Sequence, residues 1–156
     1  MPYVSKSKEL YFPIDFLFSI ALDVKRYQEF LPGVHSSQVF EESAQSFKGR
    51  LKIGAGPFSL DYISTVTYER PFWIKATCED KTFKNLQTSW VFKELSPQKV
   101  LVTCEVFFEL RKGNFFLNAA IATSLSKSSS GLLESFCKRA HHLKTSSPQQ
   151  NLACVP

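Results

Sequence analysis

The segment RYQEFLPGV, at residues 26–34, concentrates large apolar side chains within five consecutive positions, at Tyr27, Phe30 and Leu31. It is predicted to form a short helix from Lys25 to Leu31, because the Pro-Gly pair at 32–33 stops a helix. So short a helix cannot bury these side chains by itself. The segment therefore predicts a larger apolar surface, built by other parts of the chain, on which they pack.

Length and composition predict one soluble domain. The chain has 156 residues, enough for a single domain with a moderate core, and its 44% hydrophobic and 21% charged residues are ordinary for a globular protein. Its 15 phenylalanines favour either a dense aromatic core or the lining of a cavity for a large apolar ligand. The net charge of +5 permits contact with anionic lipid or RNA without requiring either.

The cysteines and the apolar runs bear on the cellular location of the protein. No pair of the four cysteines has the spacing of a C-x-x-C metal or redox motif: they are Cys78, Cys104, Cys137 and Cys154. The apolar run at 14–24 contains two aspartates and is shorter than the ~20 residues that span a bilayer. No secretory signal or Arg-rich presequence is visible. A cytoplasmic protein with buried free thiols is predicted, with a peripheral position at a membrane as the alternative.

The first third of the chain reads as a strand followed by two short helices. Residues 3–12 are predicted to be a strand, and Pro13 suits the first turn of a helix, where its missing N–H costs nothing. An apolar stripe at a spacing of four then follows at Phe16, Ile20 and Val24, with Leu17 beside it.

From His35 to Leu110 the apolar period changes to two, which predicts antiparallel strands joined by turns. The positions expected on the inner face are Phe47, Gly49, Leu51 and Ile53; Leu60, Tyr62, Ser64, Val66 and Tyr68; Phe72, Ile74, Ala76 and Cys78; Leu86, Trp90 and Phe92; and Val100, Val102, Cys104, Val106, Phe108 and Leu110. The alternate positions carry most of the charges. The pattern predicts a sheet that is apolar on one face and wet on the other.

One long C-terminal helix is predicted to cover the apolar face. Its stripe consists of Leu117, Ile121, Leu125, Ser128, Leu132, Phe136, Ala140 and Leu143. Small residues fill TSLSKSSSG at 123–131, which indicates either close approach of helix and sheet or an internal cavity between them. The domain is therefore expected to span residues 1–144, and the polar segment 145–156, with two prolines, to be a disordered tail.

Order, spacing and local sequence together resemble the START-like, or helix-grip, superfamily. Within it the chain is similar to the coenzyme Q-binding branch, which also holds a bacterial ribosome-association toxin and oligoketide cyclase/lipid transport proteins. The segments that carry the resemblance are ALDVKRYQEFLPGV (21–34), IGAGPFSLDYISTVTYERP (53–71), FKNLQTSWVFKEL (83–95), FFELRKGNFFLNAAI (107–121) and SFCKRAHHL (135–143). The likeness covers about residues 3–143, and it departs from the family pattern at Gly33 and Val34, where an aromatic residue and a cysteine are frequent.

The resemblance implies an α+β helix-grip fold: a curved antiparallel sheet, two short helices and a long C-terminal helix that enclose an apolar cavity. It implies that the short helices form part of a lid. It also implies that the cavity binds and carries ubiquinone or another isoprenoid lipid in support of respiratory electron transport, with no other cofactor. The residues expected to contact the ligand are Phe16, Ile20, Tyr27, Phe30, Leu31, Leu60, Tyr62, Trp90, Phe108, Ile121 and Leu125.

An enzyme is the first alternative, since some members of the wider superfamily cyclise polyketides. That chemistry needs acid–base groups positioned inside the cavity. Asp61, Glu79 and Glu105 fall on outward positions of their strands. His35 stands alone beside a turn, and Cys104 points inward without a predicted His partner. No catalytic residue and no metal ligand is therefore predicted.

A ribosome contact is the second alternative. Lys48, Arg50 and Lys52 form an outward basic ridge of the kind that binds phosphate. A hairpin turn at 54–57 would place Asp61 opposite Arg50 as a cross-strand ion pair, and no aromatic residues interleave for base stacking, which favours a solvated face. An anionic membrane surface is the third alternative partner, and DNA is not an expected partner.

Overall fold

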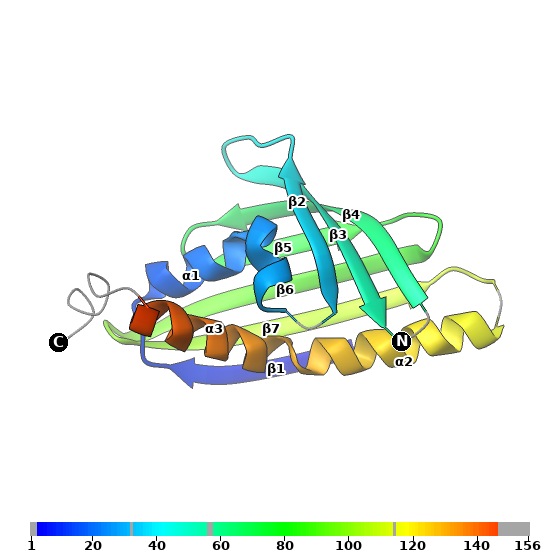
Figure 1. Cartoon of the computed structure of the whole chain (residues 1–156). Coiled ribbons are helices and arrows are strands. Elements are labelled where there is room, and N and C mark those ends of the chain that lie inside the picture. The colour runs from blue at the N-terminus through cyan, green and yellow to red at the C-terminus, as the bar shows by residue number, and fades with distance from the viewer. Residues whose placement is uncertain (1–2, 32, 56–57, 114, 147–156) are drawn as a thin grey trace.

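The computed structural model describes residues 3–31, 33–55, 58–113 and 115–146. Its seven strands form one antiparallel sheet in the order β1-β7-β6-β5-β4-β3-β2 (Figure 1). The strands are β1 (Tyr3–Leu10), β2 (Val34–Phe40), β3 (Ser46–Ala55), β4 (Phe58–Glu69), β5 (Trp73–Cys78), β6 (Phe83–Ser96) and β7 (Lys99–Leu110). Strands β2 to β7 pair in chain order, and the first strand closes the sheet beside the last. The predicted helix-grip architecture is confirmed.

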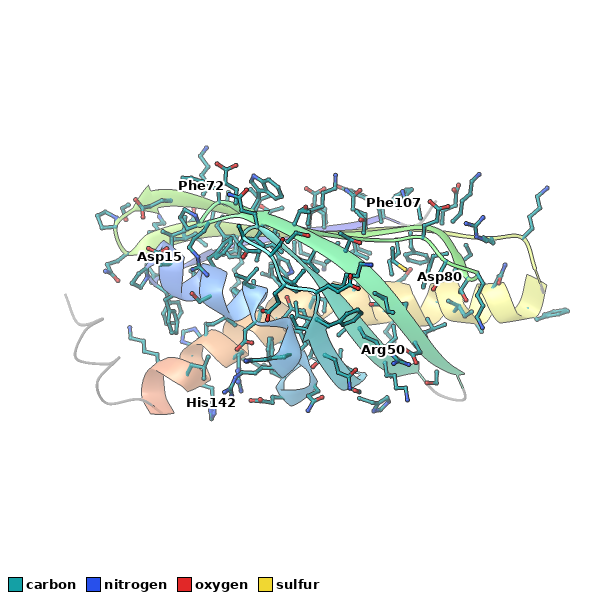
Figure 2. The ribbon with its side chains drawn as sticks, turned by 90° about the horizontal axis from the view of Figure 1, so that it is seen from above. Asp15, Arg50, Phe72, Asp80, Phe107 and His142 are labelled. Carbon is teal, nitrogen blue, oxygen red and sulfur yellow. The ribbon has the colours of Figure 1, made fainter. Side chains whose placement is uncertain are left out.

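Alternation of side chains gives the sheet one buried apolar face and one solvent-exposed face, as the sequence predicts. In β7 every second residue from Val100 to Phe108 is at most 5% exposed, while the residues between are half-buried. Figure 2 shows Phe72 and Phe107 on the face opposite the helices. The prediction of an inward Phe72 is wrong, because its N–H bonds the carbonyl of Glu69 in a turn and β5 begins only at Trp73.

The two short helices are α1 (Ile14–Leu22) and the 3₁₀ helix η1 (Val24–Glu29). η1 corresponds to the short helix predicted from Lys25 to Leu31, and its last turn is extended by a hydrogen bond of 2.9 Å from the N–H of Leu31 to the carbonyl of Tyr27. Gly33 then takes a positive φ of 81°, a conformation that glycine adopts at little cost. The chain can therefore reverse directly into β2.

The C-terminal helical segment is divided, which corrects the prediction of one long helix. α2 (Phe115–Ser130) and α3 (Leu132–Ser146) run end to end across the sheet and meet at Gly131 (Figure 1). Glycine and serine are weak helix formers, so a break in the run from Ser128 to Gly131 costs less free energy than a break elsewhere in the helix. α3 ends two residues beyond the boundary predicted at 144, and the rest of the predicted tail, 147–156, lies outside the described residues.

The apolar interior consists of two clusters of buried side chains. The larger joins α1, η1 and α3 to the sheet, and its largest fully buried side chains are Leu17, Phe18, Val100, Val102 and Phe136. The smaller joins α2 to the other end of the sheet, and consists of Cys78, Phe83, Leu86, Val106, Phe108 and Ile121. The division of the core leaves space between helices and sheet where the two clusters meet.

The thiols are free and buried at Cys78, Cys104 and Cys137, which confirms the prediction for these three. Cys154 lies outside the described residues. Among the described helices, none has the length and apolar character needed to cross a membrane.

Candidate ligand-binding cavity

A cavity of about 120 Å³ lies between the inner face of the sheet, η1, and the junction of α2 with α3. A water molecule needs only ~10–15 Å³ by this kind of measure, so the space is much larger than a solvent defect. The predicted cavity between helix and sheet is thereby confirmed, and among the described side chains of TSLSKSSSG, Ser129 lines it.

The helical wall places Val24, Tyr27 and Leu31 against the cavity. The phenol of Tyr27 donates a hydrogen bond to the carbonyl of Ala21, which fixes its ring beneath η1. η1 is also tied to β2, because Ser37 donates to the carbonyl of Lys25 over 2.9 Å. These bonds hold η1 as a fixed wall of the cavity.

Glycine at position 49 allows this wall to approach the sheet. Gly49 lies on the inner face of β3 and lines the cavity. A Cβ atom there would lie 3.3 Å from Cγ1 of Val24, closer than ordinary van der Waals contact. The absence of a side chain at Gly49 therefore sets the distance between η1 and the sheet.

Besides Val34 of β2 and Gly49 of β3, the sheet wall consists of inward residues from the five adjacent strands β3 to β7. They are Leu51 and Ile53, Tyr62, Ser64 and Val66, Ile74 and Ala76, Leu86, Thr88 and Trp90, and Val106. The ring of Trp90 packs on Phe136 of α3 with centroids 4.9 Å apart, so it is held between the sheet and the helix. The result is a wall of aliphatic and aromatic groups interrupted by two small hydroxyl residues.

The chemistry of the lining is neutral. None of the described lining residues is Asp, Glu, His, Lys or Arg. Burial raises the pKa of the phenols of Tyr27 and Tyr62 in the lining, and it raises the pKa of the Cys104 thiol, in the larger core cluster, to about 12. Phenols and thiols with raised pKa values stay protonated at neutral pH, so they are poor bases and nucleophiles. The arrangement is suited to holding an apolar ligand with a few uncharged polar atoms.

The structure distributes the predicted ligand-contact residues over three places. Tyr27, Leu31, Tyr62 and Trp90 line the cavity. Phe16, Ile20 and Phe30 instead line a separate outer groove between α1, η1 and α3. Leu60, Phe108 and Ile121 pack in or against the smaller core cluster. The side chain of Leu125 lies outside what the structure describes.

The displacement of Phe16 and Ile20 follows from the packing of α1. α1 has two apolar neighbours, the sheet and α3, so its stripe is shared between them. Leu17 and Phe18 are fully buried in the larger core cluster, while Phe16 and Ile20 turn toward the groove beside Arg139 and Leu143. Phe30, at the end of η1, lines the same groove under Arg139, and Leu60, Phe108 and Ile121 pack in or against the smaller core cluster. The predicted placement of these six residues in the cavity is thus corrected, and contact between ligand and the four cavity residues stays a prediction.

Two hydroxyl residues of the cavity, Thr88 and Ser129, were not predicted from the sequence as site residues, and Ser64 was predicted to face inward without a role. The sequence signal that could have identified Ser64 and Thr88 is a small polar residue within a row of apolar residues on the inner face of the sheet. Ser64 follows Tyr62 and precedes Val66 at a spacing of two, and Thr88 lies between Leu86 and Trp90. A polar group at such a position pairs with a protein group, or it faces space where water or a ligand can bind it.

Other candidates from the sequence lie away from the cavity. His35 is exposed, and its imidazole covers Gly54, where a Cβ atom would clash with Nε2. Glu79 pairs with Arg111 over 3.2 Å, and Glu105 accepts a hydrogen bond from the phenol of Tyr3. Among the described residues, no three of His, Cys, Asp or Glu are grouped so as to hold a metal ion.

The basic ridge of β3 is largely neutralised. The guanidinium of Arg50 donates to both carboxylate oxygens of Asp61, at 2.9 and 2.7 Å, and this lowers the pKa of Asp61. The predicted ion pair is confirmed, but its predicted register is wrong: Asp61 lies opposite Lys52, and the pair is diagonal. Lys48 pairs with Glu41 over 3.1 Å. Ion pairing of this kind is typical of a solvated sheet face.

A curved antiparallel sheet that grips a C-terminal helical segment over an apolar cavity defines the START-like class of ligand-binding domains. The chain belongs to the family described as polyketide cyclase / dehydrase and lipid transport, which matches residues 10–137.

Relatives of different names share this architecture. The chain is 28% identical over 141 residues to the ribosome association toxin RatA of Pseudomonas aeruginosa, covering 90% of this chain and 96% of the toxin. It is 28% identical over 145 residues to the mitochondrial coenzyme Q-binding protein COQ10 of Dictyostelium discoideum, covering 90% and 70%. The fold matches that of a Streptomyces aromatase/cyclase with a TM-score of 0.80 at 13% identity, covering 95% and 97%.

Proposed function

We propose that this chain binds ubiquinone or another isoprenoid lipid and carries it in support of respiratory electron transport, without chemistry of its own. The observation that carries the proposal is the cavity of about 120 Å³, whose described lining is apolar apart from hydroxyl groups. Removing apolar area from water contributes about 25 cal/mol per Å², so this lining favours a hydrocarbon ligand. The coenzyme Q-binding relative supports a quinone as the first ligand to test.

The volume indicates which part of such a ligand fits. Pockets that enclose drug-sized molecules have ~300–1,000 Å³, so the present cavity accommodates a ring or a short hydrocarbon segment. We place the opening of the cavity at Val34, Ile53 and Leu132, which are among the lining residues that are partly exposed. The remainder of a long prenyl chain would pass this opening.

Transfer of ubiquinone between two populations of vesicles tests the proposal. A carrier should accelerate the transfer, and Ala76→Phe should abolish the acceleration because the new ring fills the cavity beside Ala76. Thr77→Phe is the matched control, since Thr77 is the next residue of β5 and points to the outer face. Transfer that is no faster than without protein, or equal transfer by both variants, would contradict the carrier function.

A second candidate function is association with a ribosomal subunit. It is favoured by the match that extends over 96% of the ribosome association toxin. Sedimentation of the protein with purified ribosomal subunits tests it. Co-sedimentation that is lost when Lys52 and Lys75 are reversed in charge would support it, and absence of co-sedimentation at low salt would exclude it.

We infer that an anionic membrane surface is the place where the carrier exchanges its ligand. The support is the net charge of +5 together with an apolar ligand that has to leave a bilayer. Flotation with vesicles that contain anionic lipid, compared with vesicles of neutral lipid alone, tests this. Equal binding to both kinds of vesicle would contradict it.

A further inference from the structure

Three serines are buried in the described part of the chain, and their hydroxyl groups differ. Ser37, Ser64 and Ser129 are each at most 8% exposed. The hydroxyl of Ser37 donates to the carbonyl of Lys25 and accepts from the N–H of Gln28. Ser64 and Ser129 make no side-chain hydrogen bond to any described residue, yet no described buried polar atom is sealed away without a partner. Their hydroxyls therefore face the open space of the cavity that both residues line.

The two serines face the cavity from opposite walls. Ser64 is on β4, in the inward row between Tyr62 and Val66. Ser129 lies in the last turn of α2, just before the break at Gly131. Thr88 on β6 adds a third hydroxyl residue to the same lining. Because the hydroxyls of Ser64 and Ser129 face the cavity and make no hydrogen bond to a described residue, both can pair with a polar atom of a ligand in this otherwise apolar lining.

We propose that Ser64 and Ser129 bind the polar head of the ligand, and that this head is an uncharged ring bearing oxygen atoms. The inference rests on the proposed carrier function and adds the orientation and class of the ligand: the head enters first, and the hydrocarbon chain points to the opening at Val34 and Ile53. A serine hydroxyl both donates and accepts, so it can pair with a carbonyl or with a ring hydroxyl.

The same lining excludes ionised heads. A phosphate or carboxylate in this cavity would lose its hydration without meeting Lys, Arg or His, because none is among the described lining residues. Prenyl diphosphates and fatty acids are therefore disfavoured, although their hydrocarbon chains would fit equally well. Selection of an uncharged head group would thus come from the hydroxyls of Ser64 and Ser129 and from the lack of charged residues in the described lining.

Quenching of tryptophan fluorescence measures this selectivity directly. The sequence has two tryptophans, and Trp73 lies on the outer face, so Trp73→Phe leaves Trp90 in the cavity wall as the only reporter. In this background, decylubiquinone is titrated, and decylbenzene and dodecyl phosphate are tested as competitors. They represent a neutral oxygenated head, an apolar head and a charged head.

Ser64→Ala and Ser129→Ala should each weaken decylubiquinone binding by about 3- to 10-fold, the loss expected for one hydrogen bond. Competition by decylbenzene should not change, and dodecyl phosphate should compete poorly. Thr65→Ala is the matched control, because Thr65 follows Ser64 but is exposed on the other face. Ser64→Thr keeps the hydroxyl and should keep most of the affinity, and thermal melting checks that each variant is folded.

The outcomes distinguish the head-group assignment from the carrier function. Unchanged decylubiquinone affinity in both serine variants, or dodecyl phosphate binding as well as the quinone, would overturn the head-group assignment and leave the carrier function standing. Binding of decylbenzene without binding of decylubiquinone would have the same meaning. If none of the three compounds binds to the unsubstituted cavity, the carrier function and the head-group assignment are both wrong.

Discussion

Cys104 illustrates how a single buried residue keeps the interior neutral. Its side chain is almost fully buried, and burial raises the pKa of its thiol to about 12, against ~8.5 in an unfolded chain. A thiol protonated in this way packs like a small apolar group. The same holds for Cys78, whose pKa is raised to about 11.

Alkaline pH should therefore destabilise the fold. The unfolded chain loses the Cys104 proton above pH ~8.5 while the folded chain keeps it up to about 12, so the stability present below pH 8.5 declines across this window. The slope is at most ~1.4 kcal/mol per pH unit for one such group. Urea unfolding at pH 7, 9 and 10 measures it, and Cys104→Val should reduce the decline. An identical pH dependence in the variant and the natural chain would show that this thiol does not contribute.

Phe30 and Leu31 are neighbours with different surroundings, and their truncation should separate stability from ligand binding. Phe30 is half-buried, contacts Tyr27 edge to face and lies under the guanidinium of Arg139, outside the cavity. Phe30→Ala should cost about 1–2 kcal/mol, less than the ~3–5 kcal/mol of a fully buried ring, and leave bound lipid unchanged. Leu31→Ala should lose lipid as well as stability, because Leu31 lines the cavity.

Melting temperature and extracted lipid, measured on the same samples, check both expectations. Loss of lipid in Phe30→Ala with full retention in Leu31→Ala would show that Phe30, and not Leu31, contacts the ligand.

At the scale of elements, the position of η1 against β3 decides the width of the cavity. Gly49→Ala would bring a methyl group to 3.3 Å from Val24 and should push η1 outward. Overpacking of this kind costs ~1–3 kcal/mol. Gly113→Ala is a control, since the nearest atom would be 3.9 Å away, and its effect should stay within ~0.5 kcal/mol. Equal stability of the two variants in urea would contradict the close approach of η1 to the sheet.

The elements themselves were predictable where one physical signal dominates. Alternation from Phe47 to Leu110 predicts the strands and their inner faces, because a sheet with one wet side enforces a period of two. The break at Gly131 was not predictable in this way, since Ser128 and Leu132 continue the helical stripe across it. The placement of Phe16 and Ile20 also failed, because periodicity shows that a helix face is apolar but not which of two neighbours covers it.

Register was predictable only in part. The Arg50–Asp61 pair follows from the charges of the hairpin, but its diagonal geometry depends on the turn, which the alternation of side chains does not fix. For the cavity lining, the period of two placed Tyr62 and Trp90 on the inner face of the sheet, and the family resemblance placed Tyr27 and Leu31 in a lid. All four residues line the cavity. The cavity itself depends on how two core clusters fill the space above the sheet, which is a property of packed volumes.

At the scale of the whole molecule, the fold places a neutral cavity between two packed clusters. The larger cluster anchors α1, η1 and α3, and the smaller anchors α2 at the other end. Ligand that fills the space between them should stabilise both, because binding to the folded state alone raises the free energy of unfolding. Stability in the presence of a quinone should therefore increase with its concentration, as thermal melting over a quinone titration would measure.

The most direct test of the central claim is mass spectrometry of organic extracts from the purified protein, with Ala76→Phe and Thr77→Phe purified in parallel. We expect a quinone or another uncharged isoprenoid lipid to be extracted from the natural chain and from Thr77→Phe, and to be missing from Ala76→Phe. Lipid in equal amounts from all three proteins, or none from the natural chain after purification from membrane-containing lysate, would contradict the claim that this cavity carries a lipid.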